Sequence, residues 1–287
     1  MFEDILVPVD EGDGTDAAIG HAADLADRFG ATVHVLFVAD TNRDSVTLVG
    51  TDVVDALERE GADIVEPVAD DVRARGVECE SEIAQGDPAT TIADYAESRG
   101  MDLVVMPTRG RTGLSRYLLG SVTEKVVRLS EVPVLTIRTH DDARTSFPYE
   151  NVLIPTDGSE AASGAIDRAV DFASAFDATL HAVSVIDDTS LGFDVRSASA
   201  SGELEATADA ALADAAARAS DAGVEAVVEE VLRGEVARTI REYAEDNDID
   251  VVVMGTAGRG GADRVLLGSV TERLVRTSPV PVVTVRR

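Results

Sequence analysis

The 287-residue chain has room for two domains of ordinary size, and 45% hydrophobic residues without any Trp indicate cores built of Val, Ile, Leu and Ala. Asp and Glu number 54 against 25 Lys and Arg, a net charge of −29, which excludes binding to nucleic-acid backbones because that requires a basic footprint. So many like charges repel one another within the folded chain, and molar salt would screen that repulsion. We therefore interpret the acidity as adaptation to a salt-rich cytoplasm, with an acidic interaction surface as the alternative.

From its first residues the chain has the character of a cytoplasmic protein. Met1-Phe2-Glu3-Asp4 leads directly into an apolar run, so we expect no signal peptide. No stretch approaches the roughly 18 apolar residues of a membrane-spanning helix, so we expect no membrane contact. Cys79 is the single cysteine, which excludes an intramolecular disulfide.

Short apolar runs then alternate with helical patterns, which is typical of βαβ units and a parallel sheet. We predict strands at about 4–9, 32–38, 77–84, 103–107 and 133–138. We predict helices near 15–29, 48–74, 88–99 and 115–129. Gly61 and Pro67 interrupt the second helix, so we expect a kink or a break there, whereas its counterpart near 203–222 contains no such residues.

The second half of the chain repeats the first at an offset of 147 to 148 residues. Pro8-Val9-Asp10 returns as Pro155-Thr156-Asp157, and Leu118–Glu124 returns as Leu266–Glu272. The repeat predicts two domains, residues 1–140 and 149–287, joined by a polar linker at 141–148.

Two histidines, His34 and His181, occupy the same strand position in the two halves. We expect both to be edge-of-core residues with a satisfied hydrogen bond.

A glycine-rich loop follows the fourth strand of the second half and contains Gly255, Gly258 and Gly268. Glycine lets the backbone turn tightly and approach a phosphate, and the N-terminus of the next helix could bind an anion. An ordinary strand-to-helix turn explains the loop equally well. Asp10 and Asp157 end the first strand of each half, where a carboxylate either accepts hydrogen bonds from a ribose or caps the next helix.

The spacing Gly255-x2-Gly258-x9-Gly268-Ser269 reproduces the ATP-binding signature of universal stress proteins, and the chain resembles that family over nearly its whole length. The resemblance implies an α/β fold of two tandem doubly wound domains. Each would be a five-stranded parallel sheet of order 3-2-1-4-5 with helices on both faces. It also implies ATP or AMP as the ligand, with or without Mg²⁺, lying over the first and fourth strands.

The resemblance carries the family's binding residues onto matching positions of this sequence. In the second half these are Pro155, Thr156, Asp157, Val185, Met254, Gly255, Gly258, Gly268, Ser269, Val270 and Thr271. The first half has a weaker set of Pro8, Val9, Asp10, Val38, Met106, Arg109, Gly110, Gly120, Ser121, Val122 and Thr123. Pro107 replaces the leading glycine there and removes a backbone N–H, so we expect one good site in the second half and a weakened or altered site in the first.

Motifs of phosphate-loop enzymes, serine hydrolases and cysteine metal sites are missing from the sequence. We therefore expect a nucleotide-binding stress or signalling module that is not an enzyme. A nucleotide-free interaction scaffold and a slow nucleotide hydrolase or transferase are the alternatives. The last strand of each half, Val132–Ile137 and Val280–Val285, would be an edge strand, which favours an intramolecular pseudo-dimer and leaves a homodimer of whole chains open.

Overall fold

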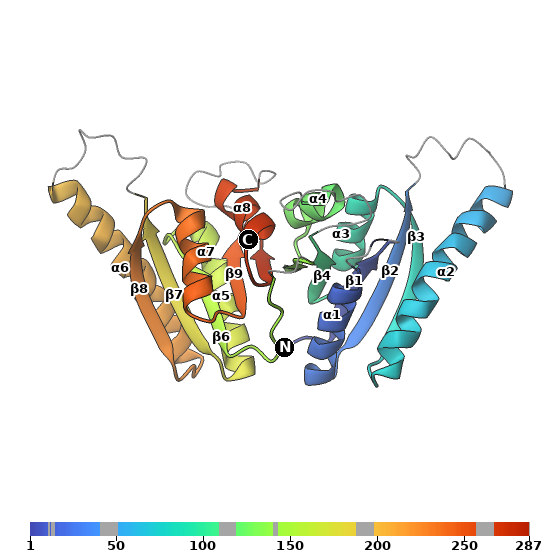
Figure 1. The fold of residues 1–287 in the computed structure, drawn as a ribbon, viewed down its shortest axis with the longest axis horizontal. Coiled ribbons are helices and arrows are strands. Elements are labelled where there is room, and N and C mark those ends of the chain that lie inside the picture. Colours follow the sequence, from blue (N-terminus) through green and yellow to red (C-terminus); the bar gives the residue numbers. More distant parts are fainter. Residues whose placement is uncertain are drawn as a thin grey trace. The chain divides into compact units, whose positions relative to one another are not determined.

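A computed structural model describes residues 1–10, 12, 15–40, 51–108, 119–139, 143–187, 198–256 and 267–286. The chain divides into two compact units, Met1–His140 and Asp141–Arg287. Each unit is an open parallel sheet with helices on both faces (Figure 1), so the predicted doubly wound α/β fold is confirmed.

The first unit contains five strands and four helices among its described residues. Its elements are β1 (Asp4–Val9), α1 (Thr15–Phe29), β2 (Thr32–Asp40), α2 (Thr51–Ala74), β3 (Cys79–Gly86), α3 (Pro88–Ser98), β4 (Leu103–Pro107), α4 (Ser121–Leu129) and β5 (Val134–Ile137). The strand order is β3-β2-β1-β4-β5, and all described pairings are parallel. Helices α1 and α2 pack on one face of the sheet, and α3 and α4 pack against each other on the opposite face.

The second unit repeats this arrangement element for element. Its elements are β6 (Asn151–Pro155), α5 (Glu160–Phe176), β7 (Thr179–Ile186), α6 (Ala198–Asp221), β8 (Val227–Arg233), α7 (Val236–Asp246), β9 (Val251–Gly255), α8 (Ser269–Thr277) and β10 (Val282–Val285). The order β8-β7-β6-β9-β10 corresponds to the first unit's, again with parallel pairing.

The core of each unit lies along the two central strands. Ile5–Val7 of β1 and Leu103–Val105 of β4 are fully buried, as are Val152–Ile154 of β6 and Val251–Val253 of β9. These continuous apolar runs follow from the architecture, because a parallel sheet covered by helices on both faces buries every side chain of its central strands.

Helix α2 runs from Thr51 to Ala74, so the break that was one of the two expected effects of Gly61 and Pro67 is absent, and the kink stays a prediction. Pro67 is exposed, so the carbonyl group that loses its helical N–H partner there can be hydrated. Gly61 is buried against β3: an added Cβ would lie 2.9 Å from Ile83 Cγ2. The glycine thus permits a close approach to the sheet and does not end the helix.

Other boundaries differ from the predictions by a few residues. Helix α4 begins at Ser121 because Gly120 has the extended backbone of an N-cap, and β3 spans Cys79–Gly86 where residues 77–84 were expected. The expected linker also includes residues held by the second unit. The Arg144 N–H donates to the Pro279 carbonyl at 2.7 Å, and the ring of Phe147 contacts that of Phe176 edge-on.

Candidate functional site

In the second unit, the central strands β6 and β9 diverge toward their carboxyl ends. Their pairing consists of Val152 with Val251 and Leu153 with Val252, whereas β6 pairs with β7 over five residues. The chain leaves β6 for α5 on one face of the sheet and reaches α8 on the opposite face after β9. In doubly wound sheets ligands bind where the connections switch faces in this way.

We call this region the second-unit switch point, defined as Pro155–Asp157, Gly255–Thr256 and Gly268–Thr271. Successive residues of a strand direct their peptide groups alternately to the two neighbouring strands. The Thr156 N–H bonds to Val183 of β7 and the Thr256 N–H to Val285 of β10, at 2.9 and 3.0 Å. By this alternation the peptide group of Pro155 points toward β9 and that of Gly255 points toward β6, beyond the last β6–β9 pair. Pro155 has no N–H to offer there, and Gly255 does.

Two hydrogen bonds hold the N-terminus of α8 against the end of β9. The Gly268 N–H donates to the Thr256 carbonyl at 2.8 Å, and the Thr271 hydroxyl donates to the Gly255 carbonyl at 2.8 Å. Gly268 is the N-cap of α8 and provides no side-chain cap. The first backbone N–H groups of a helix have no partner within it, so those of α8 are donors available at the switch point.

The turn after β6 is stabilised by its own polar side chains. The Thr156 hydroxyl accepts from the Gly158 N–H at 3.2 Å, and the Asp157 carboxylate accepts from the Ser159 N–H at 2.9 Å. Ser159 caps α5 by accepting from the Ala162 N–H. Asp157 thus stabilises the turn before the helix, and Ser159, not Asp157, is the cap of α5.

The structure brings the described members of the expected second-unit site to the carboxyl edge of one sheet. Thr156 and Met254 are buried, Val185 is half-buried near the end of β7, and Ser269 is exposed in the first turn of α8. Because its proton is committed to the Gly255 carbonyl, the Thr271 hydroxyl positions the helix, and its backbone N–H is the group left for an anion. Gly258 lies outside the described residues.

The first-unit switch point comprises Pro8–Asp10, Pro107–Thr108 and Gly120–Thr123. The same two hydrogen bonds hold its helix N-terminus against the end of β4. The Gly120 N–H donates to the Thr108 carbonyl at 2.8 Å, and the Thr123 hydroxyl donates to the Pro107 carbonyl at 2.9 Å. By the same alternation the peptide group of Pro8 points toward β4 and that of Pro107 points toward β1. Neither residue has a backbone N–H. This switch point therefore lacks the strand-end donor that Gly255 provides.

The remaining expected residues of the first unit lie as follows. The Asp10 carboxylate accepts from the Gly12 N–H at 2.9 Å, which is a local turn bond like that of Asp157. Val38 is half-buried in β2, Met106 is buried in β4, and Ser121 and Val122 begin α4. Arg109 and Gly110 lie outside the described residues.

Sequence reasoning missed Thr108 and Thr256. Each directly follows the fourth strand of its unit, and its carbonyl anchors the glycine that caps the next helix. The repeat contained the signal, because threonine stands at this position in both halves.

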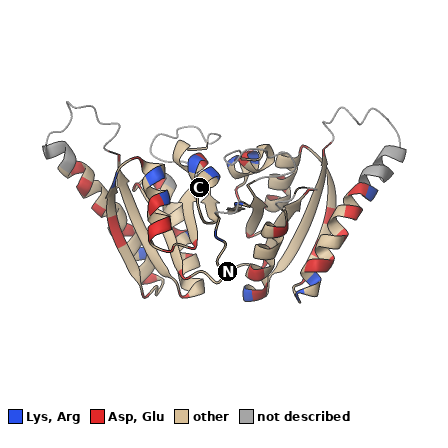
Figure 2. Cartoon of the chain, viewed as in Figure 1, with Lys and Arg blue, Asp and Glu red and all other residues tan. Residues whose placement is uncertain are grey.

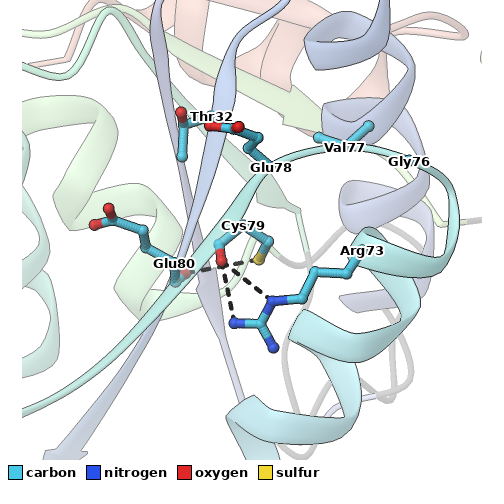
Figure 3. Close-up of a pocket in the computed structure, with 7 residues that line it drawn as sticks. All are labelled: Thr32, Arg73, Gly76, Val77, Glu78, Cys79 and Glu80. Carbon is cyan, nitrogen blue, oxygen red and sulfur yellow. Dashed lines mark hydrogen bonds between the residues drawn. The ribbon is translucent and has the colours of Figure 1, made fainter.

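A separate pocket lies at the amino end of β2 and β3, away from the first-unit switch point (Figure 3). Its lining includes Thr32, Arg73, Cys79 and Glu80, and the Arg73 guanidinium donates to the Cys79 carbonyl at 3.1 Å. Burial raises the pKa of the Cys79 thiol, which disfavours the reactive thiolate. Within the described part of the chain, no group of three or more His, Cys, Asp and Glu side chains could hold a metal ion, and no helix is long and apolar enough to cross a membrane.

Comparison with known proteins gives consistent matches over both units. The model of the universal stress protein family matches residues 1–138 and 148–286. A universal stress protein of Mycolicibacterium smegmatis is 31% identical over 295 residues, covering 98% of this chain and 96% of that protein. One from Methanocaldococcus jannaschii is 33% identical over 145 residues, covering 48% of this chain and 83% of that protein. The crystal structure of a universal stress protein from Archaeoglobus fulgidus shares the fold, with a TM-score of 0.74 at 24% identity, covering 99% of this chain and 98% of that one.

Proposed function

The chain belongs to the universal stress protein family in both of its units, and from this premise we propose that it is an adenine-nucleotide-binding stress or signalling module of the cytoplasm. The ligand, ATP or AMP, binds at the second-unit switch point. The module acts by changing shape or partner preference when the nucleotide binds, and not by rapid turnover.

The observation that carries this proposal is the set of backbone donors at the second-unit switch point. The Gly255 N–H faces the strand end beyond the last β6–β9 pair, and the first N–H groups of α8 are held nearby by the Gly268–Thr256 bond. Backbone N–H groups at a helix N-terminus suit the phosphates of a nucleotide, since they present positive dipole ends without a mobile side chain. Asp157 ends the adjacent strand, where its carboxylate can accept from a ribose hydroxyl.

The same reasoning makes the first unit the weaker binder. Pro107 stands where Gly255 stands in the second unit, so one phosphate donor is missing while the helix N-terminus at Gly120 is retained. The expected stoichiometry is therefore one strong site per chain.

The test exchanges the two residues at this single strand position. Calorimetric titration of ATP and of AMP in molar salt, with and without Mg²⁺, is made on the intact chain, on Gly255→Pro and on Pro107→Gly. Losing a hydrogen bond to a charged phosphate should weaken binding about tenfold or more in Gly255→Pro. Pro107→Gly should strengthen or create a second site.

Folding and turnover controls separate the alternatives. Pro107 already occupies the equivalent position, so Gly255→Pro should keep its unfolding midpoint. Gly202→Ala, at an exposed position of α6, should bind like the parent chain. Two equal sites would contradict the asymmetry. Absence of binding would contradict the nucleotide proposal and favour the scaffold, and steady release of inorganic phosphate would favour the slow hydrolase.

A further inference from the structure

The two units differ most clearly at a buried histidine that both contain. His34 on β2 and His181 on β7 occupy equivalent positions and are both 8% exposed. Tyr95 on α3 and Tyr243 on α7 are equivalent too, each on the helix that packs over the histidine's strand. The same pair of side chains therefore occurs twice, and its hydrogen bonds differ between the units.

In the second unit the histidine is a neutral ring with both nitrogens satisfied. Nε2 of His181 lies 3.3 Å from Asn151 Oδ1, which only accepts, so Nε2 bears the proton. Nδ1 then accepts from the Tyr243 hydroxyl at 3.0 Å. Burial lowers the pKa of His181, which keeps the ring neutral.

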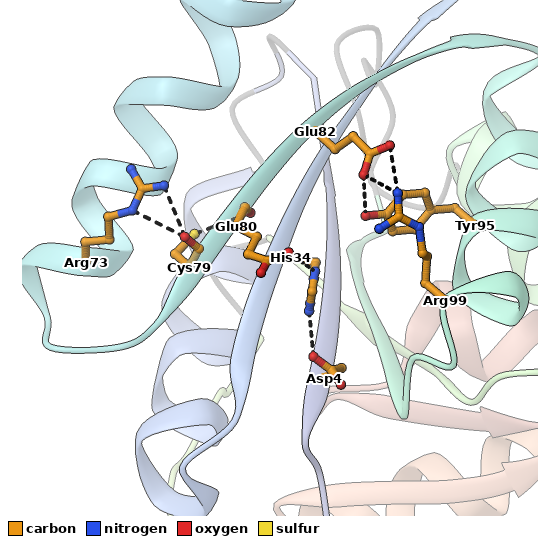
Figure 4. Close-up of polar contacts among 8 residues, drawn as sticks. All are labelled: Asp4, His34, Arg73, Cys79, Glu80, Glu82, Tyr95 and Arg99. Carbon is orange, nitrogen blue, oxygen red and sulfur yellow. Dashed lines mark hydrogen bonds and ion pairs between the residues drawn. The ribbon is translucent and has the colours of Figure 1, made fainter.

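In the first unit the ring has carboxylates in place of these neutral partners (Figure 4). Nε2 of His34 lies 2.6 Å from Asp4 Oδ1, and Nδ1 lies 3.6 Å from Glu80 Oε2. Nδ1 is buried and has no hydrogen-bond partner among the described residues. With Nε2–H committed to Asp4, a neutral ring would direct the lone pair of Nδ1 toward a negative charge. A second proton on Nδ1 turns this unfavourable contact into an ion pair.

The tyrosine of the first unit has changed partner accordingly. The Tyr95 hydroxyl donates to Glu82 Oε2 at 2.9 Å, and Arg99 pairs with the same carboxylate at 2.9 Å. Burial, together with the bond to Glu82, raises the pKa of Tyr95 to about 12, so the hydroxyl keeps its proton for donation. The hydroxyl that satisfies Nδ1 in the second unit is thus held elsewhere in the first.

We propose that His34, Tyr95 and Glu82 form a proton switch in which the Tyr95 hydroxyl exchanges between Glu82 and His34 Nδ1. With two protons on the ring, Nδ1–H faces Glu80 and Tyr95 stays on Glu82. When Nδ1 releases its proton to water past Glu80, whose side chain is 71% exposed, Tyr95 donates to Nδ1 as Tyr243 does in the second unit. The exchange replaces the Tyr95–Glu82 bond between α3 and β3 with a Tyr95–His34 bond between α3 and β2, while Arg99 keeps its ion pair with Glu82.

Asp4 and Glu80 face the ring nitrogens, and the titratable side chains of the surrounding network are mostly acids. They are Asp4 on β1, Glu80 and Glu82 on β3, Tyr95 and Arg99 on α3, and Asp102 before β4, whose carboxylate accepts from the N–H groups of Glu3 and Asp4. Arg99 is committed to Glu82, so the two ring nitrogens face the carboxylates of Asp4 and Glu80. The second unit has Asn151 and Val228 in place of those two acids, so the switch belongs to the first unit alone.

The switch is tested by NMR on the intact chain in molar salt. The ring nitrogens of His34 and the Cζ of Tyr95 are followed between about pH 5 and 8, where histidine changes its charge. We expect both signals to move with one common midpoint. The Tyr243 signal should stay constant over the range in which the Tyr95 signal changes.

Two variants keep the outcome unambiguous. In His34→Gln the Tyr95 signal should lose its pH dependence, and in His181→Gln it should keep it. A His34 ring that titrates while Tyr95 stays constant would reduce the cluster to a plain ion pair and overturn the switch. So would a ring that stays neutral throughout, or a Tyr95 transition that survives in His34→Gln.

Discussion

At the scale of single residues, burial decides the charge that a histidine can carry. His21 lies inside α1 with 4% of its surface exposed, and desolvation lowers its pKa from 6.5 to about 4. An imidazolium there would lose its hydration, so the folded chain keeps the ring neutral where the unfolded chain would protonate it. Above pH 6.5 the ring is neutral in both the folded and the unfolded chain, so its titration does not change the free energy of unfolding. As the pH falls from 6.5 toward 4, the unfolded chain binds the proton first and the free energy of unfolding decreases.

His21→Leu should remove this pH dependence. Over the interval from pH 6.5 to about 4, the parent chain should lose about 3 kcal/mol more of its free energy of unfolding than the variant, because one pKa unit corresponds to about 1.4 kcal/mol. Denaturant unfolding of both chains in molar salt at each pH measures the difference. Parallel pH profiles for the two chains would contradict the assignment, since the acidic residues that also titrate in this range are common to both.

At the scale of elements, the equivalent helices α2 and α6 use their glycines in opposite ways. Both helices span 24 residues. Gly61 of α2 is buried, and a Cβ there would lie within 3.0 Å of three carbons of the stiff, β-branched Ile83. Gly202 of α6 is exposed, and a Cβ there would meet nothing within 4 Å.

The same substitution should consequently have opposite signs in the two helices. Gly61→Ala should lower the free energy of unfolding by about 1–3 kcal/mol through overpacking against β3. Gly202→Ala should raise it by up to about 1 kcal/mol, because alanine favours the helix and costs no contact. Urea unfolding of the two variants beside the parent chain makes the comparison. If Gly61→Ala also stabilised the chain, the close approach of α2 to β3 would be wrong.

At the scale of the whole molecule, repulsion among the acidic side chains affects stability more than any single ion pair does. Acidic side chains are spread over helices and strands of both units (Figure 2), consistent with the net charge of −29. The described ion pairs with arginine and lysine are at least partly solvent-exposed, and exposed pairs contribute about 0–1 kcal/mol each. Repulsion among the remaining carboxylates is therefore the larger electrostatic effect at low salt.

We accordingly expect the melting temperature to rise with salt. Between about 0.01 and 1 M the Debye length falls from about 30 to 3 Å, which screens repulsion between neighbouring carboxylates. Thermal unfolding in a KCl series, repeated in sucrose to separate screening from general exclusion effects, measures the change. A melting temperature that fell on adding KCl would contradict our interpretation of the acidic composition.

The amino-acid sequence by itself determined the repeat, the order of the elements and the edge of the sheet at which the site residues gather. These features depend on local patterns: apolar runs such as Val251–Met254 form buried strands, and the residues that follow them lie at the carboxyl edge in any parallel sheet. The unequal switch points were also predictable, because Pro107 lacks an N–H in any fold. The pairing of the two last strands stays a prediction.

Tertiary structure decided what depends on neighbours distant in the chain. Pro67 leaves α2 unbroken because its position faces solvent, which the local sequence does not specify. The direction of the Gly255 N–H follows from the strands on either side of β9. His34 and His181 look alike in sequence, yet sheet register places Glu80 beside the first and Val228 beside the second. Local periodicity specifies the elements, whereas the charge and hydrogen bonding of a buried group are specified by the side chains that the fold brings to it.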